Sequence, residues 1–374
     1  MLKKILILFI KKWEFKKIKK IRYLIIGQDH SKFILKYLPS NKAEIVSFKI
    51  INFYIIFHLF FNNKRISKLN YFIKSIQLTD PQTVVTMIDN DTDFYRLKKY
   101  FPNKKFIAIQ NGYRTEPKKT YLIKKNEKLQ CDVIFCFGRQ NIHYYKSFIQ
   151  TRVIPIGSIK NNMISEDNLR KKRIITYISE FRPNDKNKRI NFYNLGQIYW
   201  KEALVSEVKL LKAVNFLCKK RDIKFYIMGR LLNKNKEINY FDSVIGKNNF
   251  NYVQRKNNFT SYNFLKNSHV IISMTSSLGY EMLSRNNRMI FFSKKFSKSK
   301  MISKYFRFGW PFVKQRKGFF YSDEINNKEI LRLAKNVIDC NESKWIKKKY
   351  NYQKNIISYN YNNNLLKKEL NNTL

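Results

Sequence analysis

The stretch His269-Val-Ile-Ile-Ser-Met-Thr-Ser-Ser-Leu-Gly-Tyr-Glu281 contains an apolar run, a short polar loop and the start of a helix near Leu278. A continuous apolar run without polar alternation indicates a strand buried on both faces, as in a parallel sheet. A small residue soon after such a strand suits the tight turn into the next helix. The stretch therefore predicts one strand–loop–helix unit of a doubly wound α/β fold.

The same pattern recurs along the whole chain, because apolar runs also end at or just before Gly27, Gly112, Gly138, Gly157 and Gly229. The strand candidates are 22–26, 44–48, 83–88, 105–110, 132–137, 152–156, 173–179, 223–228, 252–254, 269–273 and 288–292. Helical stretches such as 201–219 lie between them. This rhythm favours two doubly wound domains that face each other across a cleft, with ligands at the carboxyl ends of the strands.

The length of 374 residues is enough for two domains. We expect an N-terminal domain over 1–160, a polar linker over 161–172, a C-terminal domain over 173–340 and a helical tail over 341–374. No apolar run reaches the roughly 20 residues that a membrane-spanning helix needs. The four cysteines form no CxxC pair, so reduced thiols in the cytoplasm are the simplest interpretation.

The charge balance is strongly basic, with 75 Lys and Arg against 26 Asp and Glu and a net charge of +49. Lys is spread over every segment and is abundant together with Asn, Ile, Phe and Tyr, which is typical of an AT-rich genome, and we favour this interpretation. A second interpretation is a basic face at the anionic inner leaflet, where each Lys is worth about 1 kcal/mol. A nucleic-acid partner is disfavoured because RNP-like motifs, zinc spacing and a basic recognition helix are lacking.

The polar loop of the opening stretch could bind an anion. Hydroxyl residues cap helix N-termini well, and the free N–H groups there attract negative charge. A bound phosphate would then contact Thr275, Ser276, Ser277, Leu278 and Gly279. Glu281, one turn into the helix, could accept a hydrogen bond from a ribose hydroxyl. A purely structural capping box explains the serines and the glutamate equally well.

Three arginines follow strand candidates at equivalent positions, namely Arg114, Arg182 and Arg230. The guanidinium group suits planar phosphate or carboxylate groups. Asn111 belongs to an Asn-Gly turn just before Arg114, so both side chains are expected at the cleft.

Acidic residues and one histidine at strand ends are candidates for a general base. Asp89 follows the candidate strand 83–88, and Asp29 and His30 lie in the first strand-to-helix turn. The group Asp89-Asn-Asp-Thr-Asp93 could instead hold a divalent ion through Asp89 and Asp91. We prefer a polar loop with a helix cap for Asp91 and Asp93, and we expect no metal site.

Several short motifs, in order, resemble those of bacterial surface-carbohydrate (surface polysaccharide) biosynthesis proteins. These are GT-B-like glycosyltransferases related to polysialyltransferases, CDP-glycerol glycerophosphotransferases and capsule 3-deoxy-octulosonic acid transferases. The motifs are Ile109-Gln-Asn-Gly-Tyr-Arg114, Phe137-Gly138, Ile156-Gly-Ser-Ile-Lys-Asn-Asn162, Tyr177-Ile-Ser-Glu-Phe-Arg182, Ile227-Met-Gly-Arg230 and Ser276-Ser-Leu-Gly-Tyr-Glu281.

The resemblance implies a GT-B fold of two Rossmann-like domains, in which the C-terminal domain holds a nucleotide-activated donor and the N-terminal domain holds the acceptor. Asn111 and Arg114 would then face the acceptor. It also implies that no metal is needed. We hypothesise an inverting glycosyltransferase without a cofactor, whose donor is CMP-, CDP- or UDP-linked, since the resemblance does not fix the nucleotide. We expect it in the cytoplasm, with peripheral attachment to the inner membrane left open. In many such enzymes the last helices cross back to the first domain. The alternatives are a polyanion- or nucleic-acid-binding protein, and a metal-dependent GT-A transferase that uses Asp89 and Asp91.

Overall fold

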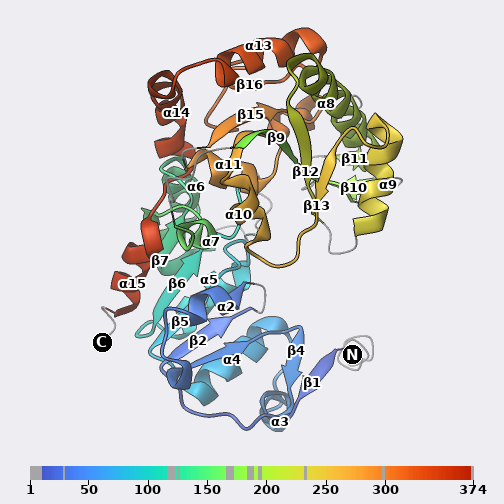
Figure 1. Cartoon of the computed structure of the whole chain (residues 1–374). Coiled ribbons are helices and arrows are strands. Elements are labelled where there is room, and N and C mark those ends of the chain that lie inside the picture. Colours follow the sequence, from blue (N-terminus) through green and yellow to red (C-terminus); the bar gives the residue numbers. More distant parts are fainter. Residues whose placement is uncertain are drawn as a thin grey trace.

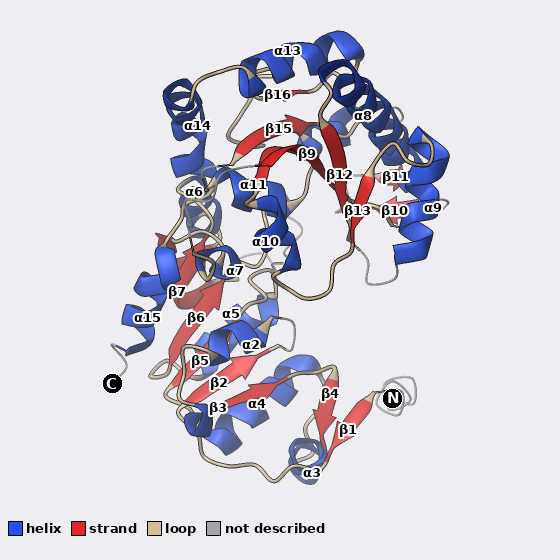
Figure 2. Cartoon of the chain, viewed as in Figure 1, coloured by secondary structure: helices blue, strands red, loops and turns tan. Residues whose placement is uncertain are grey.

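The structure is a computed structural model. It describes residues 11–27, 30–115, 123, 127–165, 172–182, 189–192, 196–230, 234–285, 287–296 and 300–371. Two six-stranded sheets dominate it, and all neighbouring strands within them are parallel. Helices flank the faces of both sheets (Figure 2), so the strands can be almost wholly apolar.

The N-terminal sheet has the strand order β3-β2-β5-β6-β7-β8. Its strands are β2 (Tyr23–Ile26), β3 (Ala43–Val46), β5 (Thr83–Thr86), β6 (Lys105–Ile109), β7 (Leu129–Cys136) and β8 (Ile149–Pro155). Its connecting helices are α2 (Ser31–Leu35), α3 (Phe53–Phe61), α4 (Lys68–Thr79), α5 (Thr92–Tyr100) and α6 (Gln140–Lys146). A two-stranded parallel ribbon of β1 (Lys12–Glu14) and β4 (Ile50–Asn52) stands apart from this sheet.

The C-terminal sheet has the strand order β13-β12-β9-β14-β15-β16. Its strands are β9 (Lys172–Ile178), β12 (Lys224–Met228), β13 (Asn251–Val253), β14 (Ser268–Ser273), β15 (Arg288–Phe292) and β16 (Tyr321–Ser322). Its helices are α8 (Trp200–Arg221), α9 (Lys234–Ile245), α10 (Thr260–Leu265), α11 (Ser277–Leu283), α12 (Lys300–Ser303) and α13 (Asn327–Ile338). Counted within the sheet, this is the order 3-2-1-4-5-6 of the dinucleotide-binding fold, which reverses direction between β9 and β14.

Short elements complete the chain. They are α7 (Ile159–Asn162), the antiparallel pair β10 (Arg189–Asn191) and β11 (Gln197–Tyr199), and the 3₁₀ turns Ser40–Lys42, Lys304–Phe306 and Tyr361–Asn363. Helix α7 occupies the start of the expected linker, and positions 166–171 of that linker lie outside the described residues.

The last two helices connect the two domains. Helix α14 (Glu342–Ile356) contributes the buried Trp345 to the core of the C-terminal domain. Helix α15 (Asn364–Asn371) instead lies beside β6 and β7 of the first domain (Figure 1). Its Leu366 and Leu370 are fully buried in a cluster with residues of β2, β5, β6 and β7. The chain therefore returns to the N-terminal domain, as the sequence resemblance implied.

Candidate active site

A pocket of about 610 Å³ lies at the carboxyl ends of the C-terminal strands. Its lining comes from the loops after β9, β12 and β14, including Glu180, Arg182, Arg230, Thr275 and Ser276. These loops meet where the strand order reverses, which is the place where open parallel sheets bind their ligands. The fold therefore brings together residues that are almost 100 positions apart in the sequence.

A buried ion pair holds the loop that follows β14. Glu180 accepts hydrogen bonds from the backbone N–H and the hydroxyl of Thr275, both at 2.6 Å, and it pairs with the ammonium group of Lys294. Burial alone would raise the pKa of Glu180, but Lys294 and Thr275 outweigh it and lower the pKa below its ordinary value. Glu180 therefore stays charged and fixes the turn that leads into α11.

Arginines give the pocket its positive charge. The guanidinium carbon of Arg182 lies 4.6 Å from the centre of the Trp200 ring, and the ammonium of Lys294 lies 4.7 Å from it. The backbone N–H of Arg230 donates to both carboxylate oxygens of the buried Glu237 at 3.1 Å, which holds the loop after β12. With Arg255, three guanidinium groups line the pocket, and they favour an anionic ligand such as a phosphate.

The N-terminus of α11 borders the pocket with Thr275, Ser276, Ser277 and Leu278. Ser276 is the N-cap residue, yet its side chain makes no capping hydrogen bond, which disfavours the capping-box interpretation. The hydroxyl of Ser277 accepts a hydrogen bond at 3.0 Å from the backbone N–H of Tyr113 in the N-terminal domain. Ser277 therefore contacts the other domain as well as the pocket.

Gly279 does not line the pocket, and its N–H donates to the carbonyl of Ser276 at 3.0 Å, so the expected phosphate contact of this N–H is wrong. Instead, Gly279 lets α11 approach the sheet closely. A Cβ at this position would lie 2.4 Å from the Ser273 hydroxyl oxygen. A close packing requirement explains this glycine.

Glu281 also lies elsewhere than expected. Its carboxylate accepts a hydrogen bond from the hydroxyl of Tyr262 on α10, and it is 3 % exposed. Burial raises the pKa of Glu281, and the charge of Lys160 and hydrogen bonds from Tyr262 and Ser158 offset this only in part. Since Glu281 faces α10 and α7 and does not line the pocket, the structure contradicts the expected ribose contact.

Asp89 is fully buried and saturated with hydrogen bonds. It accepts from Nε of Arg114 at 2.7 Å, from the Tyr145 hydroxyl at 2.7 Å and from the backbone N–H of Asn111 at 3.1 Å. Arg114 also donates to the side-chain oxygen of Asn111 at 2.7 Å. Asp89 therefore anchors this loop and is not placed to act as a base, and Arg114 and Asn111 are engaged in the same network, contrary to their expected role toward the acceptor.

His30 lies at the turn between β2 and α2. It has a left-handed backbone conformation with φ of 65°, which is uncommon for a residue other than glycine. Its ring stacks on Phe33, and Phe33 meets Phe259 of the C-terminal domain edge to face at 5.8 Å. This turn therefore faces the second domain. Asp29, the other candidate in the turn, lies outside the described residues.

The remaining acids of the 89–93 loop are engaged locally. Asp91 accepts from the backbone N–H of Asp93 at 3.3 Å and pairs with Lys68 at 2.6 Å, and Asp93 pairs with Arg96 at 2.9 Å. They therefore form a helix cap with surface ion pairs, as we preferred from the sequence. Within the described ranges, no group of three or more His, Cys, Asp or Glu side chains could hold a metal ion.

A second pocket of about 420 Å³ lies at the corresponding point of the N-terminal sheet. Gly27 after β2, Ser47 after β3 and Ile88 after β5 line it, together with Lys11 and Lys49. It also lies where the strand order reverses, between β2 and β5.

Sequence reasoning missed Glu180, Trp200 and Arg255 as pocket residues, and it missed Lys294, which pairs with Glu180. Arg255 comes directly after a strand candidate and could have been found by the rule that selected Arg182 and Arg230. The pairing of Glu180 with Lys294 could not have been found in this way, because the two residues lie 114 positions apart in the sequence.

Comparison with known proteins agrees with this architecture. MnaA from S. aureus, solved with UDP, is 14% identical with a TM-score of 0.51 over 95% of each chain. A variant of the wall teichoic acid polymerase TagF is 13% identical with a TM-score of 0.50 over 95% of this chain and 88% of that one. At such identities the similarity shows the GT-B fold alone, and the two parallel sheets exclude the GT-A alternative.

A comparison with curated proteins found no match. Among the described residues, no helix is long and apolar enough to cross a membrane. Residues 107–374, however, match the family described as "putative O-antigen biosynthesis protein". This match spans most of the chain, so the chain belongs to that family and is a surface-carbohydrate biosynthesis protein with a GT-B fold.

Proposed function

We propose that the protein is a glycosyltransferase that moves a sugar from a nucleotide-activated donor to a glycan or lipid-linked acceptor. The observation that carries this proposal is the 610 Å³ pocket with Arg182, Arg230 and Arg255 at the reversal point of the C-terminal sheet. The family supports a role in surface-polysaccharide synthesis. The UDP in the structure of MnaA, which shares the fold, is compatible with a nucleotide in this pocket.

The chain supplies what the departing nucleotide phosphate needs. As the bond between the sugar and the phosphate breaks, negative charge develops on the phosphate oxygen. Guanidinium groups that are already oriented stabilise that charge without reorganisation. The hydroxyl of Ser276 and the backbone N–H groups at the start of α11 add hydrogen-bond donors at the same place. This arrangement needs no metal ion, and we propose metal-independent transfer.

The acceptor hydroxyl must lose a proton as it attacks the sugar. Of the three residues expected from the sequence, Asp89 is excluded by its burial, and we propose His30 as the general base. A neutral imidazole accepts a proton near neutral pH, and His30 lies in a turn that faces the second domain. Attack from the side opposite the departing phosphate inverts the configuration at the sugar carbon.

Nucleotide binding tests the donor site directly. UDP, CDP and CMP would be titrated calorimetrically into the wild type and into Arg182→Ala and Arg230→Ala. Loss of a charged hydrogen bond is worth roughly 1.5–3 kcal/mol, so we expect about 10- to 150-fold weaker binding of the preferred nucleotide. Arg221→Ala is the matched control, because Arg221 pairs with Asp339 on the surface of α8 and does not line the pocket. Failure to bind any of the three nucleotides would contradict the proposal.

Turnover assays separate the mechanism from binding. His30→Asn should bind the nucleotide normally but transfer sugar about 10²- to 10⁴-fold more slowly, the usual contribution of a general base. Transfer should persist in EDTA; loss that Mn²⁺ restores would contradict the metal-independent step. If the protein converted a UDP-sugar to its epimer in the absence of any acceptor, the result would show an epimerase and contradict the proposed transferase.

A further inference from the structure

Helix α3 exposes most of its aromatic side chains. Phe53, Phe57, Phe60 and Phe61 follow the spacing i, i+4, i+7 and i+8, which places them on one side of a helix. The exposed fractions of Phe57, Phe60 and Phe61 are 46 %, 72 % and 67 %. The opposite side, with Ile55 and Leu59, is fully buried against the domain.

The exposed rings form a continuous surface. Phe57 and Phe61 lie 4.3 Å apart between ring centres, and Phe53 lies 6.0 Å from Phe57. Phe15, which is 69 % exposed and follows β1, lies 5.4 Å from Phe53 and extends the surface beyond the helix. We call these five phenylalanines the aromatic face. Water-facing aromatic clusters of this kind mark interaction sites, because each exposed ring forgoes the gain from burial.

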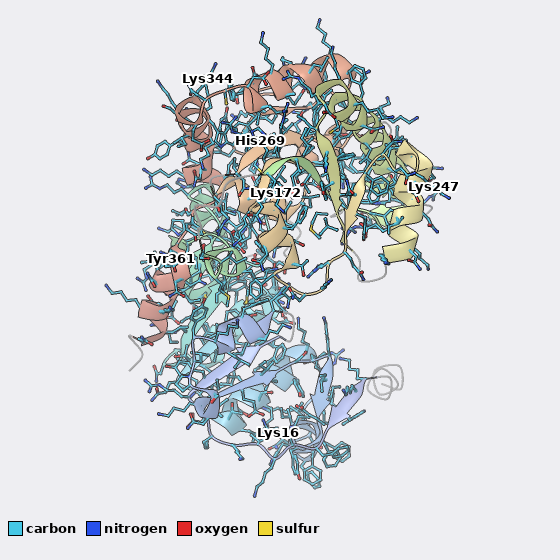
Figure 3. The ribbon with its side chains drawn as sticks, in the orientation of Figure 1. Lys16, Lys172, Lys247, His269, Lys344 and Tyr361 are labelled. Atoms are coloured by element: carbon cyan, nitrogen blue, oxygen red, sulfur yellow. The ribbon has the colours of Figure 1, made fainter. Side chains whose placement is uncertain are left out.

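Basic residues surround the aromatic face. Segments 11–20 and 49–65, which contain β1, β4 and α3, carry nine Lys or Arg residues and a single acidic residue, Glu14. Lys12, Lys17, Lys64 and Arg65 are exposed. Figure 3 shows the α3 side chains and Lys16 at the end of the N-terminal domain that lies away from the C-terminal domain.

We propose that the aromatic face and its basic rim dock on an anionic phospholipid bilayer. Aromatic rings partition into the headgroup region, and Lys and Arg beside them are attracted to anionic lipids. A helix with one side buried in its own domain and the other side aromatic lies in the plane of the interface without crossing it. The nearly complete absence of acidic side chains from both segments fits an anionic surface and disfavours an uncharged partner.

Vesicle sedimentation tests this surface with the full-length protein. Phosphatidylcholine vesicles with phosphatidylglycerol should bind the wild type, and vesicles of phosphatidylcholine alone should bind it much more weakly. Phe57→Ser combined with Phe60→Ser should weaken binding about tenfold or more, because two rings can no longer be buried. The matched control is Val205→Ser with Phe216→Ser, since both side chains are exposed on α8.

Charge is tested in the same way. Lys12→Ala, Lys64→Ala and Arg65→Ala together should weaken binding about 100-fold, since each charge near an anionic surface contributes about fivefold. Lys212→Ala, Lys219→Ala and Lys220→Ala on α8 remove equal charge elsewhere and should have a much smaller effect. Equal losses in both triple variants, or normal vesicle binding by the double serine variant, would overturn the proposal.

A second copy of the chain is the competing occupant. The proposal would fail if the wild type did not bind vesicles and sedimented as a dimer while the double serine variant sedimented as a monomer. The aromatic face would then be an interface between two copies of the chain. Nucleotide affinity should be unchanged in all α3 variants, because the aromatic face shares no residue with the 610 Å³ pocket. A result that contradicts membrane docking can therefore be distinguished from a result that contradicts the proposed nucleotide-binding site.

Discussion

At the scale of single residues, two buried glutamates beside α11 have opposite pKa shifts. Glu281 has a raised pKa because burial outweighs its polar partners, whereas Glu180 has a lowered pKa because Lys294 and Thr275 outweigh burial. Sequence spacing alone does not distinguish these cases, since both depend on which group the fold places against the carboxyl.

Replacing Glu281 by Gln should therefore change how stability depends on pH. A raised folded-state pKa means that the contribution of Glu281 is present below the ordinary value of 4.5 and is lost as pH rises through the folded-state pKa. Gln does not titrate, so the stability of Glu281→Gln relative to wild type should rise with pH and then level off. Urea unfolding between about pH 4 and 8 measures this. Glu180→Gln is the control with the opposite sign, because a lowered pKa makes wild type lose stability as pH falls below the ordinary value of 4.5, and its series is therefore extended to lower pH.

Removing Arg114 should be costly, because it leaves the charge of Asp89 buried. Arg114→Ala is expected to lower the free energy of unfolding by about 3–5 kcal/mol. In the double variant Asp89→Ala, Arg114→Ala the loss should be smaller than the sum of the single losses. The exposed pair of Arg221 and Asp339 provides the comparison, with a cost of about 0–1 kcal/mol for Arg221→Ala. If the losses of unfolding free energy in the two single variants, measured by chemical denaturation, summed to the loss in the double variant, Asp89 and Arg114 would not be energetically coupled.

At the scale of elements, α11 links the 610 Å³ pocket to the N-terminal domain. Tyr280 within α11 stacks on Tyr113 with ring centres 4.0 Å apart, and Ser277 accepts the Tyr113 N–H. The loop that carries Tyr113 is held by Gln110, whose side chain bridges Gly112 and Phe137. The first turn of α11 therefore borders the pocket and contacts the other domain.

Substitutions of Ser276 and Ser277 should distinguish a contact with the ligand from the contact with the N-terminal domain. Ser276→Ala should change stability by less than about 0.5 kcal/mol, since its side chain makes no cap hydrogen bond, and it should weaken nucleotide binding if the hydroxyl contacts a phosphate. Ser277→Ala should cost roughly 0.5–1.5 kcal/mol, because it removes the contact with Tyr113. Thermal unfolding and nucleotide titration measure both quantities. A Ser276→Ala protein with wild-type nucleotide affinity would remove this hydroxyl from the donor site.

At the scale of the whole molecule, α15 fastens the end of the chain to the first domain. Beyond its buried leucines, Glu369 pairs with Lys105 of β6 at 2.7 Å, and Arg152 of β8 pairs with the same carboxylate at 2.5 Å. The core of the N-terminal domain is therefore completed by residues from the opposite end of the sequence.

Shortening the buried leucine side chains of α15 should destabilise the N-terminal domain selectively. Leu366→Ala and Leu370→Ala should each cost about 2–5 kcal/mol, the usual range for a buried Leu. Hydrogen exchange should show lost protection in β2, β5 and β6 and preserved protection in β9, β12 and β14. Leu365→Ala on the same helix is the control, since Leu365 is 43 % exposed. Equal loss of protection in both sheets would mean that the domains unfold as one unit.

The sequence alone determined the main strands, because their burial on both faces imposes continuous apolar runs. Each strand candidate overlaps a strand of one of the two large sheets. The short strands β1, β4, β10, β11 and β16 were missed, since segments of two or three residues are too short to be recognised as strands from the pattern of apolar residues. The positions of Arg182, Arg230 and the 275–277 loop at strand ends were also readable, and the fold brings them to one pocket.

Only the tertiary structure decided which polar residues face that pocket. Asp89, Arg114 and Glu281 occupy strand ends or helix starts just as the pocket residues do, yet each turns toward a buried partner. Trp200 lines the pocket and Lys294 pairs with the pocket residue Glu180, although both come from segments that carry no motif. The physical reason is that a strand end specifies where a side chain begins, whereas its direction depends on partners, distant in the sequence, that come close only when the domain has folded.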